Sequence, residues 1–141
     1  NSVSAYSSWN LEYTYFHLAC RERLDGAIAE PERAAAAAAI RRGEILLNFG
    51  VAGSGMTERY VGRLHQLLGE FREAIPYLQA ARGRLGGMDL VATDQALMMS
   101  FLQTGQTNEA REVARYGATH AGEFAPYYQA MLRGLDAPAA P

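Results

Sequence analysis

Apolar residues recur every three or four positions along most of the chain, which places them on one face of an α-helix. Gly and Pro interrupt this pattern at intervals and separate the periodic segments from one another. No stretch alternates Val, Ile and Thr with polar residues as a strand would. The sequence therefore predicts an all-α protein with helices over residues 9–24, 31–48, 57–68, 70–85, 89–104, 107–120 and 124–135.

Residues at the ends of several segments support these bounds. Gly69 and Gly105 each follow a periodic segment, where a left-handed residue commonly ends a helix. Thr57 and Thr107 each precede one, where a side-chain oxygen commonly caps the first N–H groups. We therefore expect short loops between the helices, as in an array of helical hairpins.

In the first helix, four side chains are spaced to share one face: Tyr13, Phe16, Cys20 and Leu24. A catalytic pair of Cys20 and His17 would require a third group to orient it, and none is evident. We therefore expect Cys20 to be buried as a small hydrophobe. The alanine run at 34–39 is a strong helix former that permits close helix packing.

The composition of the chain argues against several classes of function. The 141 residues carry a net charge of −2, which gives no electrostatic footprint for nucleic acid or an anionic membrane. No apolar run approaches the ~20 residues that span a bilayer, so we expect no membrane insertion. All 13 basic residues are Arg, which excludes lysine chemistry and, with abundant Ala and Gly, suggests a GC-rich bacterial genome.

The stretch "NFGVAGSGMTER" at residues 48–59 superficially resembles a phosphate-binding loop. A P-loop follows a strand and carries a Lys after its last Gly, whereas here a helix is predicted before the glycines and Met56 follows Gly55. We interpret the glycine cluster as a joint between two helices, and we expect no nucleotide or other cofactor.

Two segments of the chain align with each other. "LLGEFREAIPYLQAA" begins at Leu67 and "LQTGQTNEAREVARYG" begins at Leu102, and both carry a Gly followed by Glu-Ala. Gly105 follows Gly69 by 36 positions (105 − 69). A period of this size, built from two helices, is typical of a solenoid.

The better copy, residues 55–88, resembles the tetratricopeptide repeat (TPR) family, whose period is about 34 residues. Its matching residues are Glu58, Val61, Gly62, His65, Gly69, Phe71, Ala74, Leu78 and Ala81. The second copy, residues 91–124, matches at Leu97, Met98, Phe101, Gly105, Ala110 and Ala114. It lacks the Gly of the first helix and the large residue that the family has at the position of Ala114.

The resemblance implies a right-handed helical-repeat solenoid of about seven antiparallel helices, forming three hairpins and a C-terminal capping helix. The expected domain spans residues 9–135, and the first eight residues and the Pro/Ala tail at 136–141 are expected to be flexible. Its parts are a divergent hairpin at 9–48, the two repeats at 55–88 and 91–124, and the capping helix at 124–135. Three hairpins are about the minimum for such a stack to be stable.

First helices of the TPR family line a concave groove that usually binds a peptide or protein segment. The resemblance places nine residues in this groove: Met56, Arg59, Arg63, Gln66, Ala92, Gln95, Met99, Leu102 and Gln103. Arg59 and Arg63 form an i,i+4 pair that can meet a carboxylate with forked hydrogen bonds. The Lys/Asn clamp of chaperone-tail-binding members is absent, so their specificity is not implied.

We therefore expect a non-catalytic adaptor or scaffold with a protein or peptide partner and no metal. His17, His65 and His120 lie on different predicted helices without metal-ligand spacing. One alternative is an accessory or regulatory domain of a larger bacterial enzyme or regulator. Another is a self-associating module that uses exposed aromatics such as Trp9 and Tyr13, together with Tyr15.

The compartment is expected to be the bacterial cytoplasm by default. The sequence does not begin with Met, however, and we expect processing or excision, so a periplasmic or secreted location stays open. The single Cys20 cannot form an internal disulfide and gives no further indication.

Overall fold

The computed structural model describes residues 2–49 and 55–137. Within these residues the chain forms seven α-helices, one short 3₁₀ helix (η1) and no strand. The bounds are α1 Ser2–Asp25, α2 Glu30–Asn48, α3 Met56–Leu67, α4 Phe71–Arg82, α5 Gly87–Gln103, α6 Thr107–His120, η1 Gly122–Phe124 and α7 Ala125–Asp136. The prediction of an all-α fold is confirmed, although α1 begins at Ser2, before the expected start at residue 9.

The two threonines predicted as N-caps lie inside their helices instead. Thr57 is the second residue of α3, whose N-cap is Gly55, and Thr107 is the first residue of α6, whose N-cap is Gln106. In both places a glycine turn leads directly into the helix, so the helix begins one residue or more earlier than the threonine would allow.

The glycine cluster lies between α2, which ends at Asn48, and α3, which begins at Met56. Residues 50–54 lie outside the described residues. The element before the cluster is a helix, whereas a P-loop requires a strand there. The bounds therefore agree with a joint between two helices.

The turns after α3 and α5 have the same geometry at positions 36 residues apart. Gly69 and Gly105 both have φ of 77°, the left-handed conformation that ends a helix. The N–H of Glu70 donates to the carbonyl of His65 at 2.9 Å, and the N–H of Gln106 donates to that of Phe101 at 2.7 Å. Both are Schellman turns, so the sequence repeat corresponds to a repeated hairpin turn.

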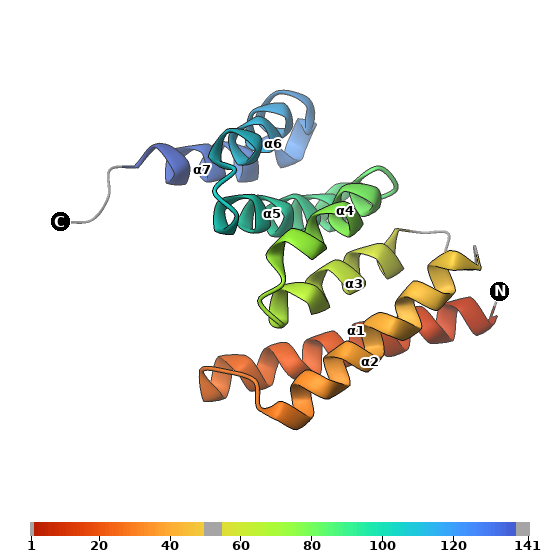
Figure 1. The fold of residues 1–141 in the computed structure, drawn as a ribbon. Coiled ribbons are helices and arrows are strands. Elements are labelled where there is room, and N and C mark those ends of the chain that lie inside the picture. Colours follow the sequence, from red (N-terminus) through yellow and green to blue (C-terminus); the bar gives the residue numbers. More distant parts are fainter. Residues whose placement is uncertain (1, 50–54, 138–141) are drawn as a thin grey trace.

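The helices stack in chain order, from α1 and α2 at one end to α6 and α7 at the other (Figure 1). Each helix packs against the next, and in addition α1 packs against α3, α3 against α5, and α5 against α7. Among the described residues, α2, α4 and α6 make no contact with one another within 8 Å between Cα atoms. The odd-numbered helices therefore form one continuous inner layer, with the even-numbered helices outside it.

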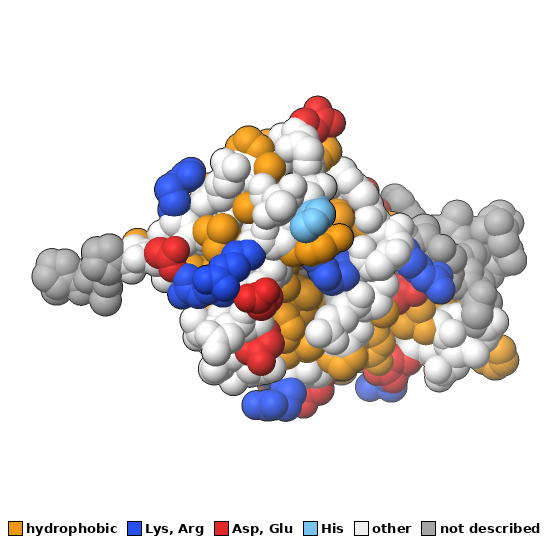
Figure 2. Space-filling view, turned by 90° about the horizontal axis from the view of Figure 1, so that it is seen from above, with side chains coloured by type: hydrophobic (Ala, Val, Ile, Leu, Met, Phe, Trp, Pro, Cys, Tyr) orange, Lys and Arg blue, Asp and Glu red, His pale blue; other side chains and the backbone are white. Residues whose placement is uncertain are grey.

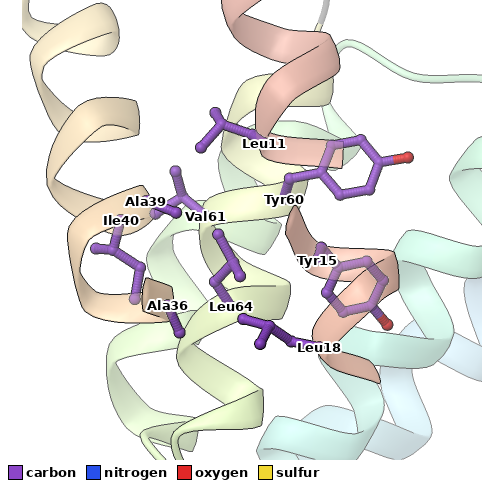
Figure 3. Packing of buried hydrophobic residues seen from close by; sticks show 9 residues of the cluster. All are labelled: Leu11, Tyr15, Leu18, Ala36, Ala39, Ile40, Tyr60, Val61 and Leu64. Carbon is purple, nitrogen blue, oxygen red and sulfur yellow. The ribbon is translucent and has the colours of Figure 1, made fainter. Parts of the chain in front are cut away.

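The N-terminal core lies between α1, α2 and α3 (Figure 3). Its buried residues are Leu11, Tyr15, Leu18, Ala36, Ala39, Ile40, Tyr60, Val61 and Leu64. The alanine side chains of α2 are short enough for the helix backbones to approach closely, as the alanine run predicted. The hydroxyl groups of the two tyrosines point away from the aliphatic side chains (Figure 3).

The face of α1 that the sequence singled out is not the buried one. Tyr13 is 62% exposed, Phe16 48% and Leu24 81%, and Cys20 is exposed as well. The prediction that Cys20 is buried was therefore wrong. α1 carries apolar residues around most of its circumference, so spacing alone did not distinguish the face that includes Leu11 from the opposite one.

The C-terminal core joins α4, α5 and α6, and α7 packs onto it. Glycines allow two of its close approaches between helices. A Cβ atom at Gly62 would lie 2.8 Å from Leu78 Cγ, and one at Gly117 would lie 2.1 Å from Tyr128 Cδ1. The side chains of α4 and α7 thus pack directly onto the backbones of α3 and α6.

A buried carboxylate connects α4, α5 and α7. Asp94 on α5 is 1% exposed; it accepts a hydrogen bond from Arg82 Nε at 2.7 Å and one from the Tyr128 hydroxyl at 2.6 Å. The hydrogen bond to Asp94 raises the pKa of Arg82. Burial, and then Asp94, raise the pKa of Tyr128, so this phenol remains a hydrogen-bond donor at neutral pH.

We expect Gly117→Ala to lower the free energy of unfolding by about 1–3 kcal/mol, because the new methyl group overlaps the rigid Tyr128 ring. Gly134→Ala is the matched control, since a Cβ atom there meets nothing within 4 Å. This control should stabilise the protein by about 0.5–1 kcal/mol through helix propensity. Urea unfolding gives the free energy of unfolding of both variants. Equal changes in the two variants would contradict the tight α6–α7 contact.

We expect Asp94→Asn to cost about 1–3 kcal/mol of stability, because the amide cannot accept both charge-assisted hydrogen bonds as the carboxylate does. Asp89→Asn makes the same change on the same helix at a side chain that is 59% exposed. It should cost at most about 1 kcal/mol. Thermal unfolding of the two variants compares the sites, and an Asp94 variant as stable as the Asp89 variant would refute the role of this network.

Candidate functional site

Every described residue that lines one surface groove lies on an odd-numbered helix, and the groove has a volume of about 690 Å³. We call it the odd-helix groove. Its lining residues are Tyr15, Phe16 and Arg23 of α1, Arg59 and Arg63 of α3, Ala92, Gln95, Ala96, Met98, Met99, Leu102 and Gln103 of α5, and Met131, Gly134 and Leu135 of α7. The inner layer of the stack therefore presents a continuous depression to solvent.

A second hollow of about 490 Å³ adjoins the odd-helix groove between α5 and α7. The two share Ala92, Gln95 and Met131 in their linings. The second hollow adds Met88 and Tyr127, which are 49% and 50% exposed. The apolar surface thus extends from α1 across α5 toward the N-terminal end of α7.

The structure brings most of the sequence-predicted groove residues together. The ones that line the odd-helix groove are Arg59, Arg63, Ala92, Gln95, Met99, Leu102 and Gln103. Sequence reasoning did not identify the contributions of α1 and α7, because the resemblance defined the groove only within the two better repeats. The apolar spacing of α7 was an available signal, whereas the spacing of α1 did not show which of its faces meets the groove.

Two of the predicted residues do not line the groove. Gln66 is 9% exposed, and its Nε2 donates to the Ala96 carbonyl and to Ser100 Oγ, each at 2.7 Å. Gln66 is covered because α5 packs against α3 at this point. Met56 is partly buried against the N-terminal core. Gln66 joins α3 to α5, and Met56 packs on the N-terminal core, at positions where the prediction placed ligand contacts.

Arg63 is held by two neighbouring side chains. Its Nε donates to the Tyr15 hydroxyl at 2.8 Å, its Nη2 donates to the same oxygen, and its Nη1 donates to Gln66 Oε1 at 3.1 Å. Its guanidinium carbon lies 5.0 Å from the centre of the Tyr15 ring. Arg63 therefore connects α1 to α3 and, through Gln66, to α5.

Arg59 is paired less completely. Its Nη1 lies 3.1 Å from the carboxylate of Asp89, which is 59% exposed. Its Nε is buried and has no hydrogen-bond partner in the part of the chain that the structure describes. Burial raises the pKa of the neighbouring Tyr60 to about 12, so this phenol is neutral at pH 7 and does not neutralise Arg59.

The lining of the odd-helix groove combines positive charge with apolar surface. Its charged members are Arg23, Arg59 and Arg63, and none of the described lining residues is acidic. This positive character is local, because Arg and acidic side chains are interspersed on the α6–α7 end of the molecule (Figure 2). The groove therefore favours an anionic group next to apolar ones.

The methionines divide between core and surface. Met98 is 5% exposed within the C-terminal core and Met131 packs against that core. Met88 and Met99 are 49% and 40% exposed. Met98 and Met131 therefore fill the C-terminal core, whereas Met99 gives the odd-helix groove and Met88 gives the second hollow an adaptable apolar surface.

The histidines lie in three separate environments. His65 is buried, its Nδ1 lies 3.0 Å from Glu70 Oε1, and its ring stacks on Tyr77 with centroids 5.5 Å apart. His17 stacks on Tyr13, and His120 stacks on Tyr116. Across the described ranges, no group of three His, Cys, Asp or Glu residues could hold a metal ion.

Among the described helices, none combines the length and the apolar character that crossing a membrane requires.

Comparisons of the chain with protein-family models, with curated proteins and with solved structures give no significant match.

Proposed function

We propose that this chain is a non-catalytic, TPR-like interaction module that binds a peptide or protein segment in the odd-helix groove. The proposal includes the right-handed solenoid of three hairpins and a capping helix. Three features support it: the Schellman turns at Gly69 and Gly105, the close approach at Gly62, and the inner layer of odd-numbered helices. As an adaptor or scaffold, such a module would join the protein that carries the bound segment to another protein.

The observation that carries the proposal is the apolar surface left exposed in the groove. Phe16, Met99 and Leu102 are 48%, 40% and 42% exposed, and all three line the odd-helix groove beside arginines. Contiguous apolar surface with a polar rim is typical of a protein interaction site. A bound segment would remove these side chains from water, which is the main source of affinity at such sites.

The ionisable groups in the lining also favour binding over catalysis. They are Tyr15 and three arginines, and arginine keeps its proton throughout the accessible pH range. Tyr15 already accepts hydrogen bonds from Arg63. These groups can attract and orient an anion, but they are poorly suited to transfer a proton to a reacting group.

We expect peptides selected from a displayed library against the wild-type protein to lose affinity for Leu102→Glu by at least about tenfold, because the carboxylate is placed in an apolar contact. Tyr116→Glu is the matched control, because Tyr116 lies on α6 and is 60% exposed outside the groove. Fluorescence anisotropy gives both affinities. Selected peptides that bind both variants as tightly as the wild type would place the interaction elsewhere.

Self-association is a second candidate function, favoured by the exposed stripe of Tyr13, Phe16, Cys20 and Leu24 on α1. Tyr15 does not contribute to it, because only 7% of Tyr15 is exposed. The side chain of Trp9 lies outside the described part of the chain.

Sedimentation velocity over a range of concentrations tests this candidate. If α1 pairs with a second copy, the sedimentation coefficient of the wild type should rise with concentration, and Leu24→Glu should abolish the rise by placing a charge in the apolar contact. Ile45→Glu, at a 55% exposed position on α2, should leave the rise of the sedimentation coefficient unchanged. A wild-type coefficient that stays at the monomer value throughout would exclude self-association in that range.

A further inference from the structure

We infer that the segment bound in the odd-helix groove is an amphipathic α-helix with acidic side chains beside its apolar face. This inference rests on the proposed function and specifies the chemistry and the secondary structure of the ligand. It follows from the hydrogen-bonding capacity of the groove, from the nature of its apolar side chains, and from the charges along its α1 and α3 side.

The groove offers few hydrogen bonds to a peptide backbone. Its walls are helices, whose own N–H and C=O groups are engaged within the helices. The neutral amide side chains in the lining are Gln95 and Gln103, and most of the remaining surface is Met, Leu, Ala and aromatic. An extended peptide laid on this surface would leave backbone groups unsatisfied, which is unfavourable once water is removed.

A helical ligand avoids this penalty because its backbone hydrogen bonds are internal. Such a ligand contributes side chains at positions i, i+3, i+4 and i+7 to an apolar groove. The exposed Met99 in the groove and Met88 in the adjoining second hollow suit this mode, since an unbranched thioether side chain adapts to the ridges of a helix. Gly134 on α7 also leaves open space above that helix, where an added Cβ atom would meet nothing within 4 Å.

The charges indicate where acidic side chains of the ligand would lie. Arg23 lines the groove on α1, is exposed, and forms no hydrogen bond or ion pair with another described residue. Among the described residues, the exposed Asp89 is the only ion-pair partner of Arg59. Because the part of the lining that the structure describes contains no acidic residue, carboxylates on the ligand can pair with Arg23, and they can compete with Asp89 for Arg59.

A designed peptide tests the inference directly. The probe is a fluorescein-labelled synthetic peptide of roughly 18 residues, about five helical turns, with Leu at helical spacing on one face and Glu beside it. One control peptide replaces its two central residues with Pro, and another replaces every Glu with Lys. Anisotropy measures affinity, and circular dichroism of an unlabelled copy measures the helix gained on binding.

We expect the acidic peptide to bind the wild-type protein and to gain helical signal. The Pro peptide should bind at least about tenfold more weakly, since Pro removes the helix. The Lys peptide should also bind at least about tenfold more weakly, because the arginines repel it. On the protein, Arg23→Glu should weaken the acidic peptide by about three- to tenfold, whereas Arg72→Glu, an exposed change on α4 outside the groove, should not.

The outcomes separate this inference from the proposed function. If the Pro peptide binds as well as the acidic peptide, or if Arg72→Glu weakens binding as much as Arg23→Glu, the helical, acidic ligand is refuted. If display-selected peptides bind at Leu102 while every designed helix fails, the inference is likewise refuted and the groove still binds peptides. If neither set binds, both proposals are refuted.

Discussion

The carboxylate of Asp94 is the contact on which the C-terminal half of the stack depends. A charge that is 1% exposed is stable only if its desolvation is compensated, and Arg82 and Tyr128 supply that compensation from two other helices. Displacement of α4 would remove the counter-ion of this buried charge, and displacement of α7 would remove one of its two hydrogen bonds. This requirement fixes α7 in place, and with it the far wall of the odd-helix groove.

At the other end of the groove, a chain of polar contacts holds three helices together. Tyr15, Arg63, Gln66 and Ser100 connect α1, α3 and α5 by side-chain hydrogen bonds. The apolar part of the groove lining thus lies between two sets of polar contacts, each of which joins three helices. Gln66, Ser100 and Asp94 help to fix the shape of the groove although they do not line it, so substitutions there and substitutions in the lining have different consequences.

The sequence was sufficient for the helices, because their apolar spacing and the glycines at 69 and 105 are local signals that tertiary packing did not override. It was insufficient wherever two faces of one helix are equally apolar, as the exposed Tyr13 and Leu24 show. It also could not distinguish Gln66, which is covered by α5, from Gln95, which faces the groove. That difference arises from how α5 lies across α3, which no local pattern encodes.

The arrangement of the inner layer has a mechanical consequence. The odd-numbered helices contact one another along the stack, whereas the described even-numbered helices do not. Each even-numbered helix instead packs against both odd-numbered helices that flank it in the chain, so a change in the curvature of the inner layer would have to alter those contacts. The width of the odd-helix groove is therefore set in part by helices behind it that do not line it.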